Sequence, residues 1–190
     1  MKLKKFSFKK IGSTNNTAIR LIKRGEKNGI IISELQTKGR GQRGNKWLSK
    51  KGNLFMTVFF EISKKVSLKK IVQLNILIIK KIIAKISNSK ITIKKPNDIL
   101  IDKKKVCGIL QEVIKYNSKT FLIIGIGVNT NISPVLLNFK STSLKNIIKK
   151  KVNNKSLLIC IKKEYEELIN KIYKNDFKNK LKFKNELSYR

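Results

Sequence analysis

The segment at residues 34–47, ELQTKGRGQRGNKW, constrains the fold more than any other part of the chain, because it separates two runs of β-forming residues. Those runs, 30–32 and 54–60, predict two strands joined by a long loop. Three glycines within six positions let main-chain amides approach a ligand closely, and Arg40 and Arg43 add two planar cations. The segment therefore suits a loop that closes over an anion, although a solvated loop of a basic protein has the same composition.

The remaining segments predict an α+β fold. Apolar residues repeat at helical spacing in four segments: 14–22, 68–86, 144–150 and 157–173. Strand-like runs occur at four further places: 91–94, 99–101, 106–116 and 121–128. This order predicts a mixed, mainly antiparallel β-sheet with helices packed on one face. We expect residues 1–190 to form a single domain, with a polar, lysine-rich end at 176–190.

The chain carries a formal charge of +34, from 45 Lys and Arg against 11 Asp and Glu, which ordinarily indicates a polyanionic partner such as nucleic acid. Only five of the 45 cations are arginine, and the lysines are spread over nearly every segment instead of forming one stripe. We therefore expect no specific nucleic-acid partner. A non-enzymatic basic nucleic-acid-binding module is the alternative, and its nonspecific form would lose binding steeply in high salt.

The composition also narrows the chemistry and the location. The chain has no histidine, which excludes Ser-His-Asp and Cys-His catalysis and most catalytic zinc sites. Cys107 and Cys160 lie in apolar surroundings and are predicted to be reduced thiols in the core. The most apolar stretch, 71–86, is interrupted by lysines and lacks the ~18 apolar residues of a membrane span. Without a signal-peptide pattern, a soluble cytoplasmic protein with no membrane partner is expected.

Four further segments carry distinctive residues, and each has an ordinary structural interpretation. STN at 13–15 is a helix cap, KKPND at 94–98 is a turn with solvated lysines, and KVCGILQE at 105–112 is a strand with a close approach at its glycine. GIGVNTN at 125–131 is a glycine-rich strand end.

Taken with the glycine loop, in this order and at these spacings, the five segments resemble those of biotin protein ligases. The usual patterns of that family are STN, QxxGRGRxGRxW, KWPND, KxxGILxE and GIGxNxN. The resemblance covers about residues 8–175 and is to the catalytic domain of the biotin-[acetyl-CoA-carboxylase] ligases.

The resemblance implies a mixed sheet flanked by helices and a two-step reaction. Biotin and ATP would form biotinyl-5′-AMP and pyrophosphate, and biotin would then pass to a lysine of the biotin carboxyl carrier protein of acetyl-CoA carboxylase. A carboxylate that attacks an α-phosphate brings two anions together, so positioning by fixed cations suffices and no protein nucleophile is required. The resemblance also implies a requirement for Mg²⁺, although no residue can be named as its ligand. It implies a monomer or a weak homodimer.

The roles known in the family fall on matching positions of this chain. Lys94 and Arg40 are the expected catalytic residues, with Lys94 bridging the biotin carboxylate and the α-phosphate and Lys105 as another contact for phosphate. The expected biotin-binding residues are Ser13, Thr14, Asn15, Gln36, Arg40, Gly41, Gln42, Lys94, Gly108 and Gly127. The expected ATP-binding residues are Arg40, Arg43, Trp47, Lys94 and Asn129, with Asn129 bonding to adenine. The glycine loop would open for entry and become ordered over the adenylate.

Three substitutions relative to the family patterns bear on the activity. Gln42 stands where many members have arginine, Lys95 replaces the tryptophan of KWPND, and Cys107 replaces a small residue. Loss of a guanidinium at position 42 would weaken adenylate retention by roughly 1–3 kcal/mol. Lys95 is expected to point away from Lys94, because alternate strand residues face opposite sides of a sheet.

The resemblance also sets expectations for the domains and for the nearest alternative. We expect no amino-terminal helix-turn-helix domain and no complete carboxy-terminal SH3-like β-barrel domain. A lipoate ligase or octanoyltransferase would share the fold and the acyl-lysine chemistry, but its characteristic motifs are not evident in this sequence.

Overall fold

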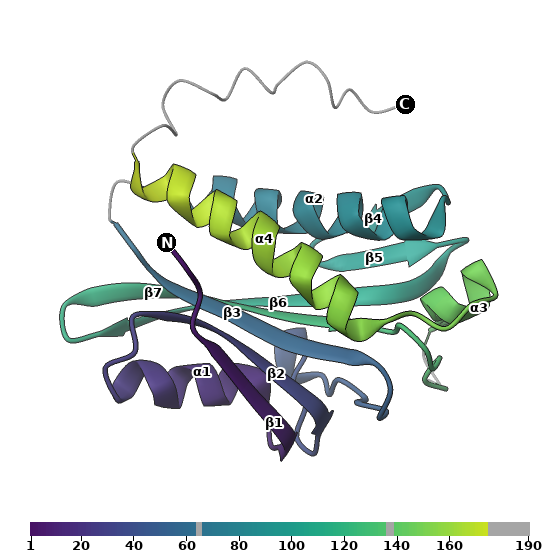
Figure 1. The fold of residues 1–190 in the computed structure, drawn as a ribbon, viewed down its shortest axis with the longest axis horizontal. Helices are drawn as coiled ribbons and strands as arrows, with labels where there is room; N and C mark the ends of the chain where they lie inside the picture. The colour runs from purple at the N-terminus through teal and green to yellow at the C-terminus, as the bar shows by residue number, and fades with distance from the viewer. Residues whose placement is uncertain (64–65, 136–138, 175–190) are drawn as a thin grey trace.

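The computed structural model describes residues 1–63, 66–135 and 139–174, which form a seven-stranded β-sheet with helices on both faces (Figure 1). The elements in chain order are β1 (Lys5–Ile11), α1 (Thr14–Lys23), β2 (Asn28–Gln36), the short 3-10 turn η1 (Gln42–Gly44), β3 (Leu54–Ile62), α2 (Leu68–Ser87), β4 (Ile91–Lys94), β5 (Asp98–Ile101), β6 (Lys104–Tyr116), β7 (Lys119–Val128), α3 (Leu144–Ile148) and α4 (Asn154–Tyr173). The order across the sheet is β1-β2-β3-β7-β6-β5-β4. Only the β1–β2 pair is parallel within the described part of the chain, so the predicted mixed, mainly antiparallel sheet is confirmed. The polar end predicted at 176–190 lies outside the described residues.

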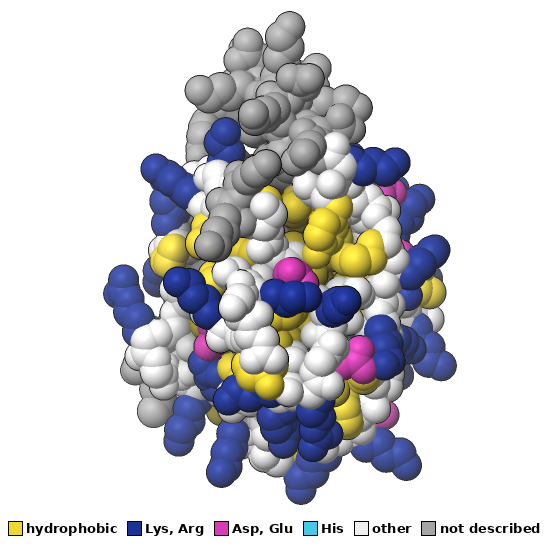
Figure 2. Space-filling view, turned by 90° about the vertical axis from the view of Figure 1, so that its left-hand side faces the viewer, with side chains coloured by type: hydrophobic (Ala, Val, Ile, Leu, Met, Phe, Trp, Pro, Cys, Tyr) yellow, Lys and Arg dark blue, Asp and Glu magenta, His cyan; other side chains and the backbone are white. Residues whose placement is uncertain are grey.

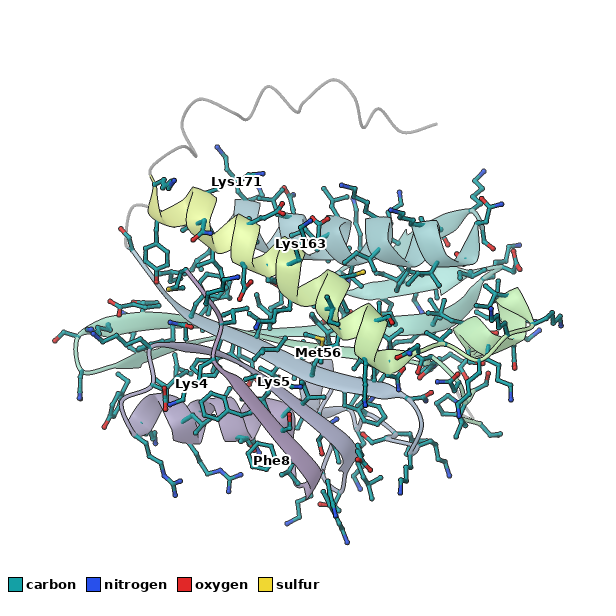
Figure 3. All side chains as sticks on the ribbon, in the orientation of Figure 1. Lys4, Lys5, Phe8, Met56, Lys163 and Lys171 are labelled. Carbon is teal, nitrogen blue, oxygen red and sulfur yellow. The ribbon has the colours of Figure 1, made fainter. Side chains whose placement is uncertain are left out.

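One face of the sheet carries the larger core. α2 and α4 lie over this face in Figure 1, and Met56, Val58 and Phe60 of β3 are fully buried in the core between the sheet and the helices. Met56 lies beneath α4 in Figure 3. The apolar repeats that predicted the two long helices are therefore the stripes that these helices bury against the sheet.

α1 packs on the opposite face, which corrects the expectation that the helices share one face. Ala18 and Ile22 of α1 form a separate buried cluster with Ile31, Phe59 and Phe121 of the sheet. The physical reason is the parallel pairing of β1 with β2, because a chain that joins two parallel neighbours must cross over the sheet between them. α1 is that crossover.

The two cysteines differ in environment. Cys107 on β6 is buried, as predicted, and its burial raises the pKa of the thiol. Cys160 is exposed, which corrects the prediction that it belongs to the core. α4 buries Leu157, Ile161 and Tyr165, whereas Cys160 precedes Ile161 by one residue and so lies about 100° around the helix from it.

The surface charge follows the expectation from the sequence. Figure 2 shows lysine and arginine side chains spread around the face in view, with apolar patches between them, and not collected in one stripe. Lys163 and Lys171, labelled in Figure 3, add to this charge along the exposed side of α4. Among the helices that the structure describes, none has the length and apolar content needed to cross a membrane.

Asn131 joins three segments at the end of β7. Its Oδ1 accepts a hydrogen bond from the amide of Val152 (2.9 Å), and its Nδ2 donates to the carbonyl oxygens of Gly52 (2.9 Å) and Val152 (3.1 Å). These bonds tie the start of β3 to the segment that leads into α4. Asn131 therefore fixes the segment before α4 to the start of β3 at this end of the sheet.

Replacing Asn131 with alanine is expected to lower the free energy of unfolding by about 2–3 kcal/mol, because the amide and the carbonyl group of the buried Val152 both lose their side-chain partner. Urea denaturation followed by circular dichroism measures this loss. Asn146→Ala is the matched control, since Asn146 is exposed and its side chain makes one hydrogen bond, to Ser133 Oγ (3.1 Å). Equal losses in the two variants would contradict the assigned role of Asn131.

Candidate active site

A cavity of about 760 Å³ opens on the α1 face of the sheet. Its size lies within the range of roughly 300–1,000 Å³ that is usual for sites of small ligands. All residues that the sequence predicts to contact biotin or ATP line it: Ser13, Thr14, Asn15, Gln36, Arg40, Gly41, Gln42, Arg43, Trp47, Lys94, Gly108, Gly127 and Asn129. The five sequence segments therefore meet at one place in the fold.

Glycines of β6 and β7 form the floor of this cavity, and their missing side chains are structurally required. A β-carbon on Gly125 would lie 2.3 Å from Oδ1 of Asn15, and one on Gly127 would lie 2.4 Å from Cε2 of Trp47. A β-carbon on Gly108 would lie 2.5 Å from Cζ3 of the same tryptophan. The glycines thus allow Asn15 and Trp47 to lie directly on the strands.

The start of α1 forms one wall. Ser13 is the N-cap residue, as the sequence predicts, and its hydroxyl accepts a hydrogen bond from the amide of Asn16. The main-chain amide and the hydroxyl of Thr14 both donate to Gln36 Oε1, at 2.8 and 3.0 Å. Gln36 Nε2 in turn donates to Ser49 Oγ (3.1 Å). The end of β2 is therefore fixed beside the helix cap, with polar groups facing the cavity.

The glycine loop folds back on itself above the floor. The amide of Trp47 donates to the carbonyl oxygen of Gly39 (3.0 Å), and that of Gly41 donates to the carbonyl oxygen of Asn45 (2.7 Å). At the tip, Arg43 has a positive φ of 53° inside η1. A β-carbon on Gly39 would lie 2.5 Å from the carbonyl oxygen of Trp47, so this close pairing of the two sides of the loop requires glycine.

Lys105 is the most enclosed cation of the site. Its side chain is 14% exposed, and its Nζ lies 2.7 Å from Oδ1 of Asp98. The same nitrogen lies 5.2 Å from the ring centre of Trp47 and 5.1 Å from that of Phe139, within the range of cation–π contacts. Asp98 is the only carboxylate among the described residues that line the cavity. Lys105 therefore presents a positive charge at the inner wall.

Lys94 and Lys95 lie at the edge of the cavity. Both are exposed, and both line it. β4 ends at Lys94, so Lys95 is the first residue beyond the strand, and its orientation relative to Lys94 stays a prediction. Position 95 thus adds a second cation to the site in place of the family's tryptophan.

Two polar atoms of the cavity wall are buried with neither a hydrogen-bond nor an ion-pair partner among the described residues. They are Nε1 of Trp47, which is a donor, and Oδ1 of Asn129, which is an acceptor. Nδ2 of Asn129 donates to the carbonyl oxygen of Lys105 (3.4 Å), which fixes the orientation of the amide. A buried donor and a buried acceptor that lack protein partners are suited to a polar ligand.

Sequence reasoning missed part of the wall. Pro134, Val135 and Phe139 follow β7 and line the cavity, but they match no motif and carry no recognisable pattern. The motifs give Glu112 no role beyond the last position of KVCGILQE, although it forms an ion pair with Arg40 of the glycine loop. An acidic side chain is rare in so basic a chain, and this rarity was the sequence signal that could have indicated an ion-pair partner.

Comparison with known proteins gives consistent matches. The model of the biotin/lipoate A/B protein ligase family matches residues 7–129. The bifunctional ligase/repressor BirA of Bacillus spizizenii is 32% identical over 171 residues, which cover 83% of this chain and 52% of that protein. BirA of Escherichia coli K12 is 31% identical over 122 residues, covering 63% of this chain and 38% of that protein.

A solved structure is similar as well. The biotin protein ligase from Aquifex aeolicus in complex with biotin and ATP has a TM-score of 0.74 at 28% identity, over 88% of this chain and 71% of that one. The chain spans about half the length of the Bacillus relative that it matches.

Proposed function

Because this chain belongs to the biotin/lipoate A/B protein ligase family, we propose that it attaches biotin to a lysine of a biotin carboxyl carrier protein in an ATP-dependent reaction that passes through biotinyl-5′-AMP. The observation that carries the proposal is the single cavity in which all five motifs meet. Its relative from Aquifex aeolicus has a similar fold and was solved with biotin and ATP.

In this proposal, the polar wall at Ser13, Thr14 and Gln36 holds the ureido ring of biotin, and the glycine floor lets the ligand lie against β6 and β7. Lys105 is the cation that draws the biotin carboxylate and the α-phosphate together, because it is more enclosed than Lys94 and its charge is less screened by water. Its ion pair with Asp98 offsets part of that charge but holds the ammonium group in place. This ranking revises the sequence-based choice of Lys94, which would then bind the outer phosphates together with Arg43 and Lys95.

Asn129 and Trp47 suit the adenine end of the same ligand. Asn129 Oδ1 can accept a hydrogen bond from an exocyclic amine, and the tryptophan ring offers an apolar surface beside it. The glycine loop covers the region between them and the biotin wall, where exclusion of water would protect the mixed anhydride from hydrolysis.

Mg²⁺ would enter with ATP. The described residues contain no group of three or more acidic, cysteine or histidine side chains that could hold a metal ion. Among the described residues, Asp98 is the one cavity carboxylate and is already paired with Lys105, so phosphate and water oxygens would supply most of the ligands of Mg²⁺.

We further propose that the protein acts in the cytoplasm as a monomer or weak homodimer, without a specific nucleic-acid partner.

A biotinylation assay tests the proposal. The purified chain, incubated with ATP, Mg²⁺, biotin and a biotin carboxyl carrier domain, is expected to increase the mass of the carrier by one biotinyl group, detected by intact-mass spectrometry. A carrier whose acceptor lysine is replaced by arginine is the control and is expected to stay unmodified. No transfer of biotin would reject the proposal, and transfer of lipoate to a lipoyl domain would select the alternative.

A further inference from the structure

Glu112 on β6 joins two parts of the active site that are far apart in the sequence. Its side chain is 22% exposed, and each of its carboxylate oxygens has its own partner. Oε2 accepts a hydrogen bond from Nδ2 of Asn15 (2.7 Å), and Oε1 forms an ion pair with the guanidinium of Arg40. The helix cap and the glycine loop are therefore connected through one carboxylate.

The Asn15 side of this connection is rigid. Asn15 is 3% exposed, and its Oδ1 accepts a hydrogen bond from Thr57 Oγ1 (2.6 Å) on β3. Its amide lies directly on Gly125, where any β-carbon would collide with it. Because Asn15 cannot move without breaking these contacts, it fixes the carboxylate of Glu112 in one orientation.

The Arg40 side belongs to the loop. One guanidinium nitrogen of Arg40 contacts Glu112, and the other donates to Oδ1 of Asn16 in the first turn of α1. Both ends of the guanidinium are thus bound to protein groups. The contact with Glu112 also offsets the charge of Arg40, whereas Arg43 has no ion pair among the described residues.

We propose that Glu112, itself fixed by Asn15, is a positioning residue that anchors the glycine loop over the cavity by holding Arg40 beside Asn16. Arg40 then acts as the fixed point of the loop, while main-chain amides at the tip and Arg43 face the ligand. The placement of the loop follows from these contacts alone. Its consequence for the retention of biotinyl-5′-AMP rests on the proposed function.

Limited proteolysis of the ligand-free full chain tests the anchor. Thermolysin cleaves before large apolar residues and does not require lysine or arginine at the cleavage site, so substitution of Arg40 removes no site. It can cut the chain before Leu48, which is exposed and directly follows the glycine loop. Glu112→Gln preserves the size of the side chain and an oxygen for Asn15 but removes the charge that binds Arg40. We expect cleavage before Leu48 to become about five- to tenfold faster, since the lost contact is charge-assisted and only partly exposed. Glu61→Gln is the matched control, because Glu61 has a comparable ion pair with Lys119 (3.2 Å) on another part of the sheet, and it should leave the rate unchanged.

The double variant distinguishes positioning from a general structural role. If Glu112 acts through Arg40, Glu112→Gln combined with Arg40→Gln should be cleaved no faster than the faster single variant. Multiplied effects in the double variant, or an unchanged rate in Glu112→Gln, would overturn the proposal. Glu112→Gln cannot be used if it lowers the urea midpoint of the whole protein, and Arg40→Gln then tests the proposal by itself. Removing either partner of the contact should release the loop, so Arg40→Gln should show the same faster cleavage before Leu48. A wild-type chain that forms no adenylate would reject the proposed function and leave this proteolysis result standing.

Discussion

On the proposed function, replacing Lys105 with methionine is expected to slow the formation of biotinyl-5′-AMP by a factor on the order of 10²–10³, the usual loss when one preorganised electrostatic group is removed from an enclosed site. Methionine retains most of the volume of lysine but has no charge, so the biotin carboxylate and the α-phosphate would repel each other without compensation. ATP–pyrophosphate exchange in the presence of biotin measures this step without the acceptor protein.

Lys94→Met is the matched control for that experiment. Lys94 lines the same cavity but is exposed, and water and salt screen its charge, so its loss is expected to cost less than about tenfold. A larger effect for Lys94→Met than for Lys105→Met would restore the original sequence-based assignment. The thermal unfolding midpoints of both variants are needed beside the rates, because Asp98 loses its ion-pair partner in Lys105→Met.

On the proposed function, replacing Gly127 with alanine is expected to raise the KM for ATP by about 10- to 100-fold. The new β-carbon would lie 2.4 Å from the Trp47 ring, and β7 is hydrogen-bonded to β3 and β6 on both sides, so the tryptophan must move and not the strand. Overpacking of this kind costs about 1–3 kcal/mol. The shift would also displace the glycine loop, since the amide of Trp47 bonds to Gly39.

Tryptophan fluorescence gives a direct view of this change, because Trp47 is the only tryptophan of the chain. Its emission is expected to move to longer wavelength in Gly127→Ala as the ring leaves the strands and meets water. Gly12→Ala is the control, since a β-carbon there would have no neighbour within 4 Å. An unchanged spectrum together with an unchanged KM in Gly127→Ala would show that the close approach of Trp47 to the floor is not needed for ATP binding.

Local sequence patterns predicted most of the elements, because the information that sets them is local. The β5–β6 hairpin follows from two apolar runs around a polar tip, and the cap at Ser13 follows from one hydroxyl before an amphipathic segment. The face on which α1 packs was predicted wrongly. It depends on the pairing of β1 with β2, which is a contact between strands and leaves no mark in the pattern of either strand.

The composition of the site was predictable from its motifs, whereas the pairing within it was not. The motifs named many of the residues that line the cavity, but Arg40 and Glu112 are 72 positions apart and only the folded sheet brings them together.

The division of the molecule by its sheet affects how the sequence can evolve. α2 and α4 require apolar side chains at helical spacing, a demand that many combinations of residues meet. The α1 side has a smaller apolar cluster, and the cavity beside it depends on individual bonds, such as those of Asn15 with Thr57 and Glu112. Laboratory selection for heat tolerance should therefore accumulate substitutions beneath α2 and α4, and selection for a different acyl substrate should accumulate them beside α1. The two sets should combine freely, because one layer of backbone separates them.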